Sequence, residues 1–189
     1  NALTGVVPVI VNNSTILAEV ENGTKTSHSR ITAGDSIGII AAADSDIYII
    51  AGGLAAAGAN AAGASINTAI LKNDIQAHAG TWTELMTTAT PAVQTSSNGI
   101  RIPNRNERRR GIIIFANGNE DVVMVSVSAG AGGSNAITGV INTLVVRNTV
   151  KATSREHVTI SVKKAAGSST NDTDPLPGVY IEAHDDTEL

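Results

Sequence analysis

The sequence predicts an all-β protein, a parallel β-helix (a β-solenoid) with coils of about 20 residues and loop insertions of variable length. Three observations predict it: an internal repeat, short runs of Val, Ile and Thr that end at Asn, Asp or Gly, and a near absence of aromatic rings. Of the 189 residues, 42% are hydrophobic but only 2% are aromatic. Because aromatic rings usually fill wide interiors, Ala, Val, Ile and Gly favour a narrow one.

The repeat is visible in an ungapped alignment of residues 1–19, 60–78 and 135–153. The first and third segments are identical at 8 of 19 positions, and the second and third at 7 of 19. Residues 39–59 also align with 114–134 at the same offset of 75, which extends the match to 40 residues. Fixed units separated by variable segments are typical of solenoids.

The chain is therefore expected to be a single β-solenoid piece of a longer array, spanning 1–189. Its repeat-aligned units are 1–19, 39–78, 114–153 and 179–189, the last resembling the opening of a further copy. The segments between them are rich in Ser, Thr, Asn, Gly and Pro, as loops are. These expected loop insertions lie near 22–34, 81–110 and 154–178.

Within the units, alternation in "VMVSVSAG" and "VTISVKK" indicates strands with one buried face. Residues 39–59 and 60–80 are 21 residues each, so each is expected to form one coil. Asn67 and Asn142 would occupy corners, where Asn tolerates positive φ. The expected inward stacking columns are Ile70 with Val145 and Ile75 with Val150. A β-sandwich is the main rival, but it gives no reason for the ungapped repeat.

The segments "AGDSIGIIAAADSD", "AGGLAAAGANAAGASINTAI" and "DIQAHAG" resemble the repeat regions of large exoproteins of Gram-negative bacteria. These include filamentous-haemagglutinin-type proteins, leukotoxin-like exoproteins and β-helical autotransporter passengers. The resemblance covers nearly all of the chain outside the loops. It implies a right-handed parallel β-helix that is secreted across the outer membrane, displayed on or released from the cell surface, and used in adhesion and virulence.

Charge and composition exclude several function classes. The net charge of −4 gives no reason to expect a nucleic-acid partner, and the absence of Cys excludes disulfides and thiolate metal sites. The apolar run 47–64 approaches the length of a membrane span, but it is mostly Ala and Gly, so no membrane insertion is expected. No cofactor is expected.

The strongest ligand-binding candidates are Arg105, Arg108, Arg109 and Arg110, in "RIPNRNERRR", together with Trp82, the sole Trp. Arginine gives bidentate contacts to anionic groups, so the run could bind an anionic glycan or a phosphate. It could also be a solvated loop that keeps a sheet edge from pairing with other chains. Trp82 could stack on a sugar or cover an open flank of a coil.

No catalytic or metal site is expected. The acidic pairs could hold Ca²⁺, but Asp44 aligns with the uncharged Asn119, which favours plain turns. These pairs are Asp44/Asp46, Asp172/Asp174 and Asp185/Asp186. The four His residues lack metal-ligand spacing, and paired carboxylates for glycoside cleavage have almost no aromatic platform beside them.

The expected function is a non-catalytic structural and adhesive segment, a rigid stalk displaying loops for host-surface or cell–cell contact. Its partners would be a host-cell glycan or protein, and neighbouring coils of the same chain. One alternative is a glycan-binding or glycan-cleaving β-helix with the 81–110 loop forming a groove. Another is a passenger segment of a secreted toxin.

Overall fold

The computed structural model describes residues 1–88, 99–163 and 177–188, and within them it contains strands and no helix, which confirms the all-β prediction. Accordingly, this part of the chain has no helix long and apolar enough to cross a membrane. The strands are β1 (Ala2–Val6), β2 (Val9–Val20), β3 (Ser29–Ala33), β4 (Ile37–Ala57), β5 (Asn60–Ala79), β6 (Thr83–Thr87), β7 (Ile100–Arg101), β8 (Arg108–Arg109), β9 (Gly111–Gly132), β10 (Asn135–Ser154), β11 (Thr159–Val162) and β12 (Gly178–Glu188).

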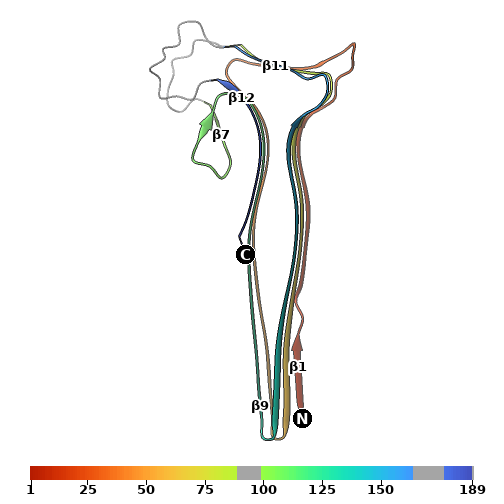
Figure 1. The fold of residues 1–189 in the computed structure, drawn as a ribbon, viewed down its shortest axis with the longest axis vertical. Coiled ribbons are helices and arrows are strands. Elements are labelled where there is room, and N and C mark those ends of the chain that lie inside the picture. The colour runs from red at the N-terminus through yellow and green to blue at the C-terminus, as the bar shows by residue number, and fades with distance from the viewer. Residues whose placement is uncertain (89–98, 164–176, 189) are drawn as a thin grey trace.

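Three parallel sheets and one two-stranded antiparallel sheet, β7 with β8, make up the described residues. The first contains β1, β2, β5 and β10, the second β4, β9 and β12, and the third β3, β6 and β11. The first two face each other along an extended arm, and the third crosses between them at one end, which we call the head (Figure 1). The opposite end, where β4 turns into β5 and β9 turns into β10, is the tip.

The strand register pairs the same residues as the sequence alignment. Asn60 pairs with Asn135 and Ile37 with Ile112, and both pairings continue residue for residue along the strands at an offset of 75. At the N-terminal end, Ala2 pairs with Ala61. Each strand therefore rests on the equivalent strand of the next repeat.

The expected coil of about 20 residues is wrong. Residues 39–59 and 60–80 are not stacked on each other, because β4 and β5 form opposite walls of the arm joined by a turn at Gly58 and Ala59. Equivalent positions recur only every 75 residues. Asp44, Asp46, Asp185 and Asp186, which were expected in turns, lie inside long strands.

The expected loop insertions also contain regular structure. Segments 22–34, 81–110 and 154–178 include β3, β6 and β11, which pair in parallel to form the third sheet. Thr159 pairs with Glu84, at the same offset of 75 as the long strands. Asp172 and Asp174 lie outside the described residues.

The interior of the arm is narrow, and this explains its small side chains. A Cβ on Gly53 would lie 2.6 Å from the carbonyl oxygen of Ala64, and one on Gly63 would lie 2.9 Å from that of Ala129. The inward positions of β5 are correspondingly small, with Ala61, Ser65 and Ala69 buried. The head is wider and holds the main aliphatic core. That core includes Ile37, Ile39, Ile75, Leu85, Ile112 and Ile114.

The two expected stacking pairs therefore point in different directions, one into the interior and one toward the outer face. Ile75 is fully buried and Val150 packs against the same core, so this pair stacks inward. Ile70 and Val145 also stack in register, but they face outward, and Val145 is 37% exposed. The correction follows from strand alternation, which places Ala69 and Leu71 inside and Ile70 outside.

Asn67 and Asn142 are neighbours, as expected, but they lie in the middle of β5 and β10 and not at corners. Asn67 is buried, and its Nδ2 donates to the carbonyl oxygen of Val125 at 3.2 Å and to the Oγ of Ser126 on the opposite sheet. The Ser126 hydroxyl donates in turn to Oδ1 of Asn142. These amides tie the two walls of the arm together.

Candidate functional site

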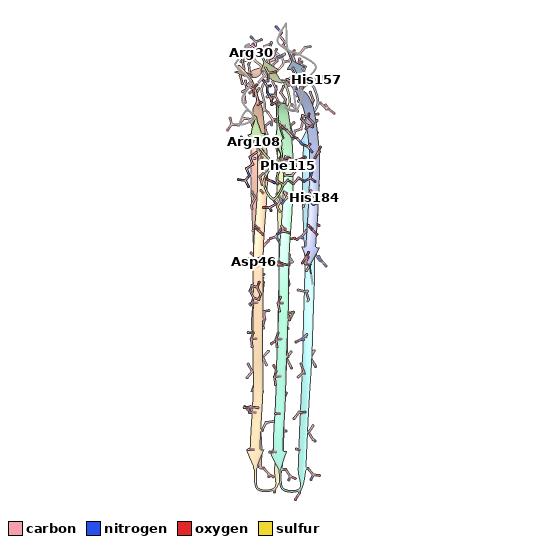
Figure 2. The ribbon with its side chains drawn as sticks, turned by 90° about the vertical axis from the view of Figure 1, so that its left-hand side faces the viewer. Arg30, Asp46, Arg108, Phe115, His157 and His184 are labelled. Atoms are coloured by element: carbon pink, nitrogen blue, oxygen red, sulfur yellow. The ribbon has the colours of Figure 1, made fainter. Side chains whose placement is uncertain are left out.

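The hairpin formed by β7 and β8 is the main addition to the repeat. Its strands are antiparallel, and its turn contains Asn104 with φ of 56°. Ile102 of the hairpin is fully buried with Ile113 and Phe115 of β9. Apolar contacts therefore anchor the hairpin on the outer face of the β4–β9–β12 sheet, near the head (Figure 2).

Two of the predicted arginines are held by carboxylates of the chain itself. Arg109 forms ion pairs with Glu182 and, at 3.0 Å, with Glu107, while its guanidinium lies 4.7 Å from the ring centroid of Tyr180. The hydrogen bond to Glu182 is the main cause that raises the pKa of Arg109 above its ordinary value. Arg105 lies 3.4 Å from both Glu107 and Glu182.

Arg110 forms a separate ion pair with Asp35, just before β9 and β4 begin. Arg110 is buried, and its Nε donates a 2.9 Å hydrogen bond to Oδ1 of Asp35. Burial raises the pKa of Asp35, but hydrogen bonds from Arg110 and Ser36 and the charge of Arg110 outweigh it and leave the pKa below its ordinary value. This pair joins the starts of two stacked strands.

Arg108 differs from the other three. It is exposed, and its Nη1 donates to the carbonyl oxygen of Gly99 at 2.9 Å. Arg101, also exposed, lies directly opposite it across the hairpin. Within the "RIPNRNERRR" segment, Arg101 and Arg108 are the arginines most accessible to a ligand.

Trp82 lies at the corner between β5 and β6, on a different sheet from the hairpin. Its ring stacks on His157 with centroids 3.9 Å apart and planes 11° apart, and His28 lies 5.7 Å away. Because β6 lies between β3 and β11 in the sheet, the two imidazoles approach Trp82 from opposite sides. A sugar could stack on Trp82 only by displacing one of them.

Glu84 completes this corner. Its carboxylate contacts His28 Nδ1 at 2.8 Å and Arg30 Nη2 at 2.6 Å. The hydrogen bonds with His28 and then Arg30 lower the pKa of Glu84 below its ordinary value. Alignment of the long repeats alone did not reveal the stacked rings of His28, Trp82 and His157, because these three residues fall in the segments expected to be loops.

Sequence reasoning also missed Glu120, which is fully buried between the sheets. Its Oε1 accepts a 2.8 Å hydrogen bond from Asn73 Nδ2, and its Oε2 accepts one from Asn148 Nδ2. Ser14 extends the network by donating to Oδ1 of Asn73 at 2.6 Å. Strand alternation places position 120 of β9 on the inward face, and this is the sequence feature that could have identified it. This network links three layers of one sheet to the other sheet.

Across the described ranges, no three or more His, Asp or Glu side chains gather in a way that could hold a metal ion. The ionisable groups near the hairpin and near Trp82 are engaged mainly with each other. Comparison of the chain with protein-family models, curated proteins and solved structures found no match.

Proposed function

We propose that this chain is a non-catalytic structural segment of a bacterial surface exoprotein, built as a flattened right-handed β-solenoid with 75 residues per turn. The residue-for-residue parallel register of β4 on β9 and of β5 on β10 carries the proposal. In such an array each repeat is stabilised by its neighbours. The resemblance to haemagglutinin-type and autotransporter repeats supports the surface location and the adhesive role.

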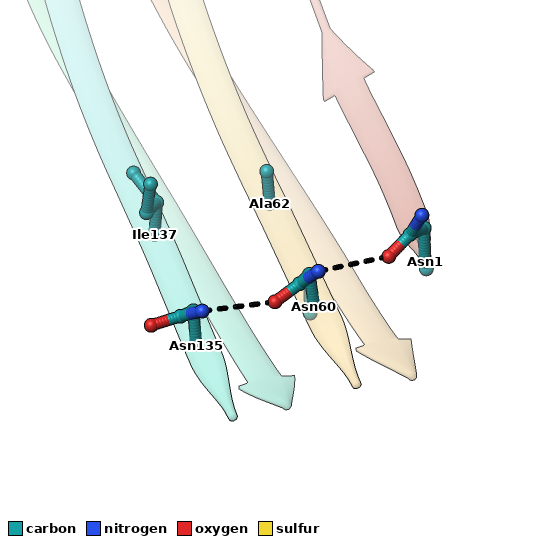
Figure 3. A pocket seen from close by; sticks show the side chains of 7 residues that line it. Asn1, Asn60, Ala62, Asn135 and Ile137 are labelled. Atoms are coloured by element: carbon teal, nitrogen blue, oxygen red, sulfur yellow. Dashed lines mark hydrogen bonds between the residues drawn. The ribbon is translucent and has the colours of Figure 1, made fainter. Parts of the chain in front are cut away.

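Hydrogen-bonded side-chain ladders support a mechanical role. At the tip, Nδ2 of Asn135 donates to Oδ1 of Asn60 at 3.0 Å, and Nδ2 of Asn60 donates to Oδ1 of Asn1 at 3.0 Å (Figure 3). Such a ladder connects equivalent positions of three successive layers. It resists shear between them, which is what a stiff spacer requires.

The adhesive contact is proposed for the hairpin, with a host-cell glycan or protein as partner. Arg101 and Arg108 are exposed on an element that Ile102 anchors to the rigid sheet. Loops held by a rigid scaffold are common binding elements. Two guanidinium groups on adjacent strands suit a sulfated or carboxylated glycan.

A glycan-array screen tests this function. We expect binding to anionic glycans that falls at least tenfold for Arg101→Ala with Arg108→Ala. The matched control is Arg147→Ala, which removes an exposed arginine from β10. If the hairpin variant binds glycans as well as the unsubstituted chain does, the hairpin is not the contact site. If the unsubstituted chain binds no glycan on the array, the chain is a spacer without a glycan contact.

A further inference from the structure

The arm beyond Asp46 carries no charge at all. Residues 1–12, 47–71 and 122–146, which we call the distal arm, contain no Asp, Glu, Lys, Arg or His. The labelled charged residues of Figure 2 lie at the head or between the head and Asp46. A surface of this kind is unusual, because water-exposed strands normally carry polar side chains on their outer face.

The outer face of β4 and β9 in the distal arm is apolar except for the hydroxyl of Tyr48. All ten outward positions from Tyr48 to Ala56 and from Val123 to Ala131 are exposed. Ile50 is 80% exposed and Leu54 is 75% exposed. We call this surface the β4–β9 face. Its members are Tyr48, Ile50, Gly52, Leu54, Ala56, Val123, Val125, Val127, Ala129 and Ala131.

We propose that the β4–β9 face binds the same face of a second copy of this chain, with the two arms antiparallel. Tyr48, Ile50 and Leu54 are 66%, 80% and 75% exposed, and a large contiguous apolar patch on a soluble protein marks an interaction site. The absence of charge removes electrostatic repulsion between two copies.

Side-chain size along the face favours the antiparallel arrangement. Toward the head lie Tyr48, Ile50 and Val125, which are large. Toward the tip lie Ala56, Ala129 and Ala131, which together with the larger Leu54 border a shallow groove of about 300 Å³. In a two-fold antiparallel pair, Tyr48 and Val123 of each copy rest on Ala56 and Ala131 of the other, as a self-complementary interface requires.

The opposite sheet is a weaker candidate for the same contact, because Thr68 and Thr143 interrupt its outer face.

Sedimentation velocity over a range of micromolar concentrations tests the proposal. The intact chain is expected to form a dimer, and Ile50→Lys with Val127→Lys is expected to raise the dissociation constant by about 100-fold or more, since both charges would be buried unpaired. The control pair is Val11→Lys with Ile137→Lys on the opposite sheet, at 63% and 71% exposed positions. This control should leave the dimer intact.

Cysteine cross-linking provides a second test that does not rely on disrupting the interface, because the chain has no Cys of its own. Facing sheets lie about 10 Å apart, so a bis-maleimide of that span is suitable. A mixture of Tyr48→Cys and Ala131→Cys chains should cross-link, whereas Tyr48→Cys alone should not. A monomer at every concentration, dissociation by the control pair alone, or efficient cross-linking of Tyr48→Cys to itself would overturn the proposal.

Discussion

Asn73 and Glu120 face each other from opposite sheets, and Nδ2 of Asn73 donates a 2.8 Å hydrogen bond to Oε1 of Glu120 in the buried interior of the arm. Asn148, which pairs with Asn73 in the next layer, donates to the other carboxylate oxygen. One carboxylate therefore satisfies amides from two successive repeats. The polar network specifies the register of the layers as well as joining the sheets.

Glu120→Ala should destabilise the protein by about 1–3 kcal/mol, because it leaves the buried Nδ2 of Asn73 without its acceptor. Asn148 keeps Asp185 and Thr187 as further acceptors. Glu120→Gln keeps one acceptor oxygen and should cost less. Urea unfolding followed by circular dichroism measures both. The neighbouring outward position supplies the control, Asp121→Ala, which is expected to change stability by less than about 0.5 kcal/mol. A larger loss for Gln than for Ala would contradict this role for the carboxylate.

The narrow interior of the arm leads to a second prediction. Gly53→Ala places a Cβ 2.6 Å from the backbone oxygen of Ala64, so the walls must separate, at a cost of about 1–3 kcal/mol. The adjacent Gly52 faces outward, and a Cβ there would meet its nearest atom at an ordinary 3.6 Å. Thermal melting should therefore show a lower Tm for Gly53→Ala and an unchanged or higher Tm for Gly52→Ala. Equal effects would mean that the walls are not in close contact.

The short runs of Val, Ile and Thr predicted the all-β class, and the repeat predicted the residue pairs between layers. An offset of 75 between Asn60 and Asn135 specifies which residues stack, and the strand register reproduces it. It does not specify how many corners lie within one repeat. Asp44 and Asn67 are common turn residues, yet both lie mid-strand, where Oδ1 of Asp44 accepts a hydrogen bond from Asn119 and Nδ2 of Asn67 donates one to Ser126.

The direction of the side chains could not be predicted by placing the largest apolar residues inside. Where two sheets approach as closely as they do at Gly53 and Gly63, only small side chains fit between them. Nearer the head, strand alternation places Ile70 and Val145 outside, while Ala69 and Leu71 lie inside. The candidate arginines were found from the sequence, but their carboxylate partners were not, because Glu182 is 73 residues from Arg109 along the chain.

The stack of Trp82 on His157 gives a third prediction. His157→Asn removes the ring but tolerates the observed φ of 58°, and it should cost about 0.5–1.5 kcal/mol. His157→Phe keeps a ring for stacking but adds backbone strain at this φ, so the Asn variant is the cleaner measure of the stack. Trp82 is the sole Trp, so its fluorescence reports this corner directly. His184→Ala, in β12, is the control, and a shift in Trp emission for that variant would contradict the assignment.

The ion pairs of Asp35 and Glu84 predict how stability depends on pH. Burial raises the pKa of Asp35, but Arg110 and Ser36 lower it further than burial raises it, while His28 and Arg30 lower that of Glu84. A carboxyl whose folded pKa lies below its unfolded value binds fewer protons when folded, so its stabilising contribution is present above the unfolded pKa. That contribution is lost as pH falls through the folded pKa.

Stability should therefore decrease as the pH is lowered below about 5. Glu84→Gln should make this decrease shallower, because the substituted group no longer titrates. Asp35→Asn should also make it shallower, although this variant is expected to be less stable at neutral pH. Urea midpoints measured between neutral and acidic pH give the slopes. Asp46→Asn, at an exposed position of β4, is the control and should keep the slope of the unsubstituted chain. Unchanged slopes in both ion-pair variants would show that other carboxyls govern the acid response.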